Sequence, residues 1–172
     1  STITVSPIAN GCPGTPSSYN ITVNPTPVVV VSPSSAAFCE GGFADLIVSG
    51  ADNYLWSPAT GLTSTTNDSV TASPTTTTTY TITGTYYGCE GDTTITITVY
   101  PNPVVTFTAS DTAGCQPLCV DFTNLTTISS GNIISWMWDF GDNNSSSSEN
   151  PNHCYPDTGD YTVSLLAISD HQ

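Results

Sequence analysis

Six cysteines carry the most evident chemistry in this sequence: Cys12, Cys39, Cys89, Cys115, Cys119 and Cys154. Zinc sites favour tight clusters such as C-x-x-C, and the sequence has no such cluster. Cys115 and Cys119 lie close together, but His153 and His171 are the only histidines that could join them. Cysteines of exported proteins usually form disulfides. We therefore expect structural disulfides rather than a metal centre.

A hydrolytic site is the second chemistry to consider. His153, Asp139 and the run Ser145–Ser148 contain the residue types of a Ser/His/Asp triad. The serine run lacks the glycine-flanked elbow that exposes a nucleophile, and no other segment supplies an oxyanion hole. Acidic residues that could cleave a glycosidic bond are plentiful, but no pattern places two of them in one cleft. We predict no catalytic residues and no enzymatic activity.

Calcium is the one ligand that the acidic residues could hold. Asp139, Asp142, Asn143 and Asn144 concentrate oxygen donors at one turn, and Asp157 and Asp160 lie at another. Their order does not match the twelve-residue EF-hand loop. We predict no cofactor, with a calcium site at Asp139, Asp142 and Asn143 as the single exception to test.

The charge balance excludes two classes of partner. The chain has no Lys or Arg and 14 Asp and Glu residues, which gives a formal net charge of −14. Binding to nucleic acid or to an anionic membrane depends on basic side chains, so neither partner is expected. No apolar run approaches the roughly 18 residues that span a bilayer. No signal peptide opens the sequence either, so we expect any export signal to lie outside it.

The elements that must position these residues are strands. Apolar residues alternate with threonine or serine at 80–83, 93–99 and 161–165, which is typical of half-buried β-strands. Thirteen prolines and thirteen glycines fall mostly between these runs, as residues of turns do. We predict an all-β chain.

An internal repeat indicates the domain boundaries. Asn24-Pro-Thr-Pro-Val-Val-Val30 returns as Tyr100-Pro-Asn-Pro-Val-Val-Thr106, and Gly11-Cys12 returns as Gly88-Cys89. The x-Pro-x-Pro segments favour stiff, extended linkers because proline fixes φ and restricts the preceding residue. We therefore predict the terminal strands of an incomplete domain at 1–26 and a complete sandwich at 27–103. A third domain, at 104–172, lacks its last strand.

The third segment carries a recognisable motif. It contains Trp136-Met-Trp-Asp-Phe-Gly-Asp142, then Asn150-Pro-Asn-His-Cys-Tyr155, then Gly159-Asp-Tyr-Thr-Val163. This order resembles the PKD (polycystic kidney disease) domain, whose hallmark is W-x-F-G-D, N-P-x-H-x-Y and G-x-Y-x-V. The residues that carry the motif are Trp136, Trp138, Asp139, Phe140, Gly141, Asp142, His153, Tyr155 and Tyr161. Asn143 stands where family members usually have glycine, and Asn tolerates the same left-handed turn.

The resemblance implies tandem immunoglobulin-like β-sandwich domains joined by short Pro-rich linkers. Residues 39–42, 54–62 and 79–84 look like a bacterial Ig-like repeat, and residues 9–27 look like the end of a PKD-like one. Such modules occur in large repetitive exported surface proteins of Bacteroidota, many of them adhesins. We expect Trp56 to fill the core of the second domain. In the PKD segment, we expect Trp136 and Trp138 to face opposite sides, one in the core and one against a flank.

The repeats also suggest how the cysteines pair. Cys39 and Cys89 share the second domain, so we predict that they pair, and Cys119 and Cys154 share the third. Cys12 occupies the position of Cys89, so its partner is expected upstream of Ser1. Cys115 is expected to pair with a cysteine just after Gln172, where related repeats carry Gly-Cys.

Several sequence sites resemble acceptors of glycans. Ser69, Thr93 and Thr112 each follow an aspartate, as do the O-glycosylation sites of exported Bacteroidota proteins that they resemble. Five asparagines begin N-x-S/T sequons, a pattern that chance alone produces in a Ser/Thr-rich chain. They are Asn20, Asn67, Asn124, Asn143 and Asn144. The alternative is that these residues are ordinary turn and strand positions.

These observations favour an extracellular protein, on the cell surface or secreted, with a structural or adhesive role as a spacer. Its partners are then neighbouring repeats, or copies of itself in a fibre. An adhesin module that binds surface glycans or proteins is the alternative, with Tyr86-Tyr87 and the turn at 139–144 as candidate surfaces. An accessory domain of an enzyme is a third reading. A filament subunit is a fourth, because strands at 1–26 could insert into the next copy.

Overall fold

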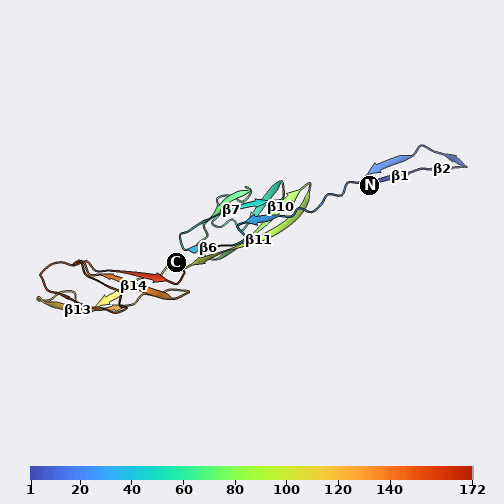
Figure 1. Ribbon diagram of the computed structural model, residues 1–172. Coiled ribbons are helices and arrows are strands. Elements are labelled where there is room, and N and C mark those ends of the chain that lie inside the picture. The colour runs from blue at the N-terminus through green and yellow to red at the C-terminus, as the bar shows by residue number, and fades with distance from the viewer. Residues whose placement is uncertain (172) are drawn as a thin grey trace.

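The structure, a computed structural model, describes residues 1–171 and contains only strands, turns and loops there. Three parts follow one another along an extended arrangement, with an isolated hairpin at the N-terminal end (Figure 1). The predicted all-β class is confirmed, and the two larger parts are Ig-like β-sandwiches. Within residues 1–171 no helix has the length and apolar character that crossing a bilayer requires.

The N-terminal part is a β-hairpin without a core. Strand β1 (Thr2–Val5) pairs antiparallel with β4 (Ser17–Asn20), and the short strands β2 (Ile8–Ala9) and β3 (Cys12–Pro13) form its tip. Every residue of these four strands is exposed. Two strands alone cannot enclose an apolar face, so this hairpin contributes little stability of its own.

The middle domain is a complete seven-stranded sandwich. Its first sheet has the order β5-β7-β9 and its second the order β6-β11-β10-β8. The strands are β5 (Val30–Ser32), β6 (Ala36–Cys39), β7 (Ala44–Ser49), β8 (Asn53–Ser57), β9 (Ser69–Ala72), β10 (Thr78–Tyr86) and β11 (Cys89–Tyr100). The alternation seen in the sequence explains the packing, because Leu46, Ile82 and Ile97 point inward while threonines cover the outer face.

The C-terminal domain repeats this plan with one strand fewer. Its sheets have the orders β12-β13-β16 and β15-β14-β17. The strands are β12 (Phe107–Ala109), β13 (Leu118–Asn124), β14 (Ile133–Asp139), β15 (Ser145–Ser146), β16 (Asn152–Tyr155) and β17 (Ser164–Ser169). Strand β17 takes the place of β10, because each pairs with the strand that carries the buried tryptophan. No strand of residues 1–171 takes the place of β11 beside it.

The two tryptophans of β14 differ from the prediction. Trp138 is fully buried, and Trp136 is half-buried against the same core. Residues two apart in a strand point to the same side of a sheet, so the expectation that they face opposite sides was wrong. The exposed residue between them, Met137, is the one that points outward. Trp56 fills the core of the middle domain, where the sequence placed it.

Candidate functional site

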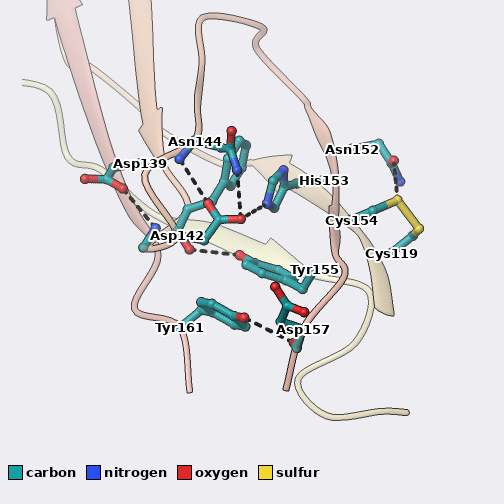
Figure 2. A network of polar contacts seen from close by, with 12 residues as sticks. Cys119, Asp139, Asp142, Asn144, Asn152, His153, Cys154, Tyr155, Asp157 and Tyr161 are labelled. Carbon is teal, nitrogen blue, oxygen red and sulfur yellow. Dashed lines mark hydrogen bonds and ion pairs between the residues drawn. A yellow bond between two sulfur atoms is a disulfide. The ribbon is translucent and has the colours of Figure 1, made fainter. Parts of the chain in front are cut away.

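The PKD motif builds a hydrogen-bonded turn at the end of β14 (Figure 2). The Oδ1 atom of Asp139 accepts a hydrogen bond from the backbone N–H of Gly141 at 2.9 Å. The carboxylate of Asp142 accepts hydrogen bonds from the backbone N–H of Asn144 at 3.1 Å and from its side-chain amide at 3.0 Å. Gly141 and Asn143 have positive φ values of 79° and 69°, which is why glycine and asparagine stand there.

His153 ties this turn to β16. Its Nε2 atom lies 2.8 Å from the Oδ2 atom of Asp142, and the two side chains are only 14% and 11% exposed. The ring stacks on Phe140 with centroids 4.1 Å apart, and it meets Tyr155 edge-on at 4.6 Å. The imidazole therefore serves as a structural clamp between the turn and the core.

The charge state of Asp142 follows from these contacts. Burial raises the pKa of its carboxyl group, but the hydrogen bonds from Asn144 and His153 outweigh burial and lower the pKa below the ordinary 3.8. The same carboxylate affects a neighbour. The pKa of the Tyr155 hydroxyl is raised by burial and then by the negative charge of Asp142. The hydroxyl group donates to the carbonyl oxygen of Phe140 at 3.1 Å.

In the described chain, several of the candidate calcium and catalytic residues have hydrogen-bond partners within the protein itself. Residues 1–171 contain no group of three or more His, Cys, Asp and Glu side chains arranged to hold a metal. Asp139 and Asp142 are engaged by donors of the protein itself. His153 faces Asp142, while Ser145 and Ser146 form the short strand β15 against β14. The Ser/His/Asp arrangement that the sequence analysis considered and did not predict is not assembled from His153, Asp139 and these serines, and calcium binding stays a prediction.

One of the predicted disulfides is present. Cys119 on β13 and Cys154 on β16 are joined, with an S–S distance of 2.01 Å, and they face each other in the strand register. The bridge lies in the sheet opposite the one that carries Trp138. It fastens β13 to β16, the strand that carries the second part of the PKD motif.

The predicted pairing of Cys39 with Cys89 is wrong. Both are free thiols in the structure, as are Cys12 and Cys115. Cys39 pairs in register with Tyr100, at the far end of β11 from Cys89. The eleven residue-to-residue steps from Cys89 to Tyr100, at about 3.3 Å each, put the two cysteines roughly 36 Å apart, whereas the Cα atoms of a disulfide lie about 4.4–6.8 Å apart.

The two outer cysteines cannot be followed to their predicted partners, because those lie outside residues 1–172. The geometry nevertheless changes the expectation for Cys115. It precedes β13, beside the loop that leads into β17 at Tyr161. The chain leaves β17 at the opposite end of the domain, where the carbonyl oxygen of His171 lies 3.4 Å from the Sγ atom of Cys39. His171, the last residue that the structure describes, therefore lies beside Cys39 and not beside Cys115.

The joint between the two sandwiches is a structured contact that the sequence did not reveal. The rings of Tyr100 and His171 stack with centroids 4.0 Å apart. The Asn102 side chain donates to the carbonyl oxygen of Glu40 at 3.1 Å, which holds the Pro101–Pro103 linker against the middle domain. The x-Pro-x-Pro pattern indicated a linker in the sequence. It did not indicate the ring stacking, because His171 and Tyr100 lie far apart along the chain.

The joint before the middle domain is built in the same way. Asn24 donates from its side chain to the carbonyl oxygen of Tyr87 at 3.3 Å, and its own carbonyl oxygen lies 3.7 Å from the Sγ atom of Cys89. Asn24 is the repeat counterpart of Tyr100. At both joints, a turn at the end of one module therefore contacts the segment that leads out of the module before it.

The structure shows how exposed the predicted glycosylation sites and the candidate binding tyrosines are, and their roles stay predictions. Ser69 and Thr112 are exposed, whereas Thr93 is half-buried on β11. Among the sequon asparagines, Asn124 is half-buried and the other four are exposed; these are Asn20, Asn67, Asn143 and Asn144. Tyr86 and Tyr87 meet edge-on at the tip of the β10–β11 hairpin, and Tyr87 is 70% exposed.

Comparison with known proteins agrees with the C-terminal motif. Residues 100–172 match the PKD domain. The chain is 45% identical over 40 residues to "Collagenase ColQ1" of Bacillus cereus strain Q1, a match that covers 23% of this chain and 4% of the collagenase. It is 49% identical over 35 residues to "Collagenase ColA" of Bacillus cereus strain ATCC 14579, over 20% of this chain and 4% of that protein.

A solved structure also matches over most of the chain. A chimeric titin Z1Z2 functionalised with a decorin peptide is 14% identical and has a TM-score of 0.34, over 86% of this chain and 92% of its own. The curated relatives are far longer than this chain, which spans about 4% of their length. PKD domains are generally non-catalytic parts of extracellular multidomain proteins. Residues 100–172 of this chain are a PKD domain.

Proposed function

We propose that this chain is a spacer segment of an extracellular multidomain surface protein or fibre, in which linked β-sandwiches hold other parts at a distance. The observation that carries the proposal is the repeated joint, in which a turn at the end of one module lies on the segment that leads out of the module before it. Contacts of this kind restrict bending, and the proline linkers restrict it further. A spacer needs stiff joints and no catalytic residues.

The surface supports the same role. With 14 Asp and Glu residues and no Lys or Arg, the chain repels copies of itself and stays hydrated. The Cys119–Cys154 disulfide agrees with an oxidising, extracellular location. Cell-surface attachment and the bacterial adhesin context rest on the resemblance and are part of this proposal.

Small-angle X-ray scattering of residues 1–172 tests the stiffness of the joint. We expect a single elongated distance distribution for the natural protein. The triple variant Pro101→Gly, Asn102→Ala, Pro103→Gly should broaden it, because it removes both the fixed φ angles and the bond to Glu40. Pro156→Gly, in an exposed loop inside the C-terminal domain, is the matched control and should change nothing. A natural protein as broad as the triple variant contradicts the spacer role.

Binding of a glycan or protein is the second candidate, and Tyr87 is the residue that favours it. An aromatic ring exposed at a hairpin tip is a common contact for sugars and peptides. A glycan array probed with the natural protein and with Tyr87→Ala tests this candidate. Binding that the substitution leaves unchanged removes it.

A further inference from the structure

A cleft lies along β14 on the side where β15, and not β17, is its neighbour. Its volume is about 550 Å³, which is within the range of about 300–1,000 Å³ that small-molecule sites occupy. All of its lining residues lie within 135–147, on β14, on β15 and in the turn between them. Strand β15 pairs with β14 only at Trp138 and Asp139, so the preceding part of this edge of β14 borders the cleft. The cleft is therefore built wholly from described residues.

The polar side chains of the cleft keep hydrogen-bonding groups that the protein does not use. The Oδ1 atom of Asp139 accepts a hydrogen bond from Gly141, whereas its other carboxylate oxygen points away from the turn (Figure 2). Asn143, Ser145 and Ser147 are exposed, and the hydrogen bonds within residues 1–171 leave their side chains free. The cleft thus offers donors and acceptors side by side.

Trp136 and Met137 give the cleft an apolar part. Met137 is 57% exposed and Trp136 is half-buried. The indole N–H of Trp136 is shielded from solvent and has no acceptor among residues 1–171. The indole N–H of Trp138 has an acceptor, and so has the hydroxyl group of Tyr54, the counterpart of Trp136 in the middle domain. Because a buried donor without an acceptor costs free energy, a turn of the Trp136 ring toward an acceptor in the cleft is favourable.

The charge of the lining excludes two classes of ligand. The chain has no Lys or Arg, and Asp139 lines the cleft, so a phosphate, sulfate or carboxylate group would be repelled there. A metal ion lacks its ligands as well, because residues 1–171 contain no group of three His, Cys, Asp or Glu side chains that could hold one. The ligand that fits this cleft is neutral.

The backbone of the cleft disfavours a peptide. A peptide that adds to a sheet needs a continuous edge with which to pair. The pairing of β14 is irregular between Ile133 and Ser135, and β15 covers the strand from Trp138 onward. Residues 135–137 alone are left as a regular open edge, which is too short for a stable strand pair.

We propose that this cleft binds a neutral oligosaccharide. A sugar ring has an apolar C–H face and a rim of hydroxyl groups that both donate and accept hydrogen bonds. The C–H face packs on Trp136 and Met137, and the hydroxyl groups bond to the Asn143 amide and to the free oxygen of Asp139. A sugar oxygen also accepts the N–H of Trp136 once the ring has turned. This binding site goes beyond the proposed spacer role and does not rest on it.

An array of neutral oligosaccharides, probed with residues 1–172, tests the proposal. The natural protein should bind at least one of them, and a titration of tryptophan fluorescence with that sugar then gives its Kd. Asn143→Gly removes the side-chain amide but keeps the turn, because glycine adopts the φ of 69° found at this position. The variant should bind the sugar roughly threefold to tenfold more weakly, as the loss of one hydrogen bond predicts.

Met137→Ala tests the apolar part and has a matched control. It should also weaken binding, because it removes the side chain on which the sugar packs. Leu166 lies opposite Met137 on β17, is 55% exposed and does not line the cleft. Leu166→Ala should therefore bind like the natural protein. Trp136→Phe keeps an aromatic ring but lacks the N–H, and it should abolish most of the fluorescence change that the sugar causes.

Four results would overturn the proposal. These are a natural protein that binds no neutral oligosaccharide on the array, binding that Asn143→Gly and Met137→Ala both leave unchanged, equal losses in Met137→Ala and Leu166→Ala, and binding that Tyr87→Ala alone removes. The last result would place the sugar at the tip of the β10–β11 hairpin instead. None of these failures affects the spacer role, because small-angle scattering measures the stiffness of the joint independently.

Discussion

The Nε2 atom of His153 lies 2.8 Å from the Oδ2 atom of Asp142, inside the turn that carries the PKD motif. This contact joins the end of β14 to β16, which are strands of opposite sheets. Asp142 also accepts two hydrogen bonds from Asn144. The carboxylate is therefore the centre from which the turn is organised, and its protonation has consequences for stability.

The first prediction concerns acid stability. Because the folded protein lowers the pKa of Asp142 below 3.8, the ionised carboxylate stabilises the fold above that pH, and this stabilisation is lost as the pH falls through the lowered pKa. In the variant Asp142→Asn, the side chain has no carboxyl group that could take up a proton in this pH range. We expect its melting temperature to lie below that of the natural protein at neutral pH, and the difference to shrink as the pH falls below 3.8 and the natural carboxylate gains a proton. Thermal melts across this range measure it.

A second carboxylate, that of Asp170, also makes the stability of the protein depend on pH, so the variant at Asp142 keeps part of this dependence. Backbone and side-chain hydrogen bonds from Asn132 lower the pKa of Asp170, so Asp170 adds acid lability of the same sign. Asp142→Asn should remove part of the pH dependence, and the double variant with Asp170→Asn should remove more. A pH profile of Asp142→Asn parallel to that of the natural protein contradicts the role assigned to Asp142.

The second prediction tests whether the two sandwiches unfold separately. Trp56 and Trp138 occupy equivalent places, since each indole N–H donates to a loop carbonyl oxygen at 2.9 Å, that of Asn67 or Ser148. Their cores share no residue. Substitution of either tryptophan by alanine should cost about 3–5 kcal/mol in its own domain. In scanning calorimetry, Trp56→Ala should lower one transition and Trp138→Ala the other, and a shared shift of both would argue for a single cooperative unit.

The third prediction concerns the disulfide. The bridge between Cys119 and Cys154 spans 35 residues, and closing such a loop contributes about 2–4 kcal/mol. Dithiothreitol should therefore lower the transition of the C-terminal domain and leave that of the middle domain in place. The double variant Cys119→Ala, Cys154→Ala is the control, because it should melt low with or without the reductant. A reductant effect that persists in this variant would show that another cysteine pair had formed.

The sequence predicted most of the fold because a two-residue alternation is a local signal. Threonine and aliphatic residues marked the strands, and the core position of Trp56 was predicted from its place on one of them. The turn around Asp142 was also predictable, since Asp and Asn side chains accept bonds from N–H groups two residues ahead. The short strand β15 was missed, because two serines carry no hydrophobic pattern.

The features that escaped prediction depend on contacts between distant segments. Cys39 and Cys89 share a domain, but the parallel pairing of β6 with the end of β11 decides that they lie far apart. Parallel pairing leaves no mark in the local sequence. The stacking of His171 on Tyr100 is of the same kind, because it depends on where β17 ends relative to the preceding domain. Only the three-dimensional arrangement shows which end of a domain a cysteine or an aromatic ring occupies.

The last prediction concerns calcium, which the clustered oxygen donors at 139–144 suggest and the geometry disfavours. A calcium ion takes six to eight oxygen ligands, mostly carboxylates and carbonyls. Asp142 already accepts hydrogen bonds from Asn144 and His153, and Asp139 accepts one from Gly141, so a bound ion would compete with these donors for the carboxylate oxygens. We expect calcium to leave the melting temperature of the C-terminal domain unchanged beyond the effect of magnesium at equal ionic strength. A saturable calcium-specific rise that Asp139→Asn abolishes would instead establish a site at this turn, and would require Asp139 and Asp142 to exchange their protein donors for the ion.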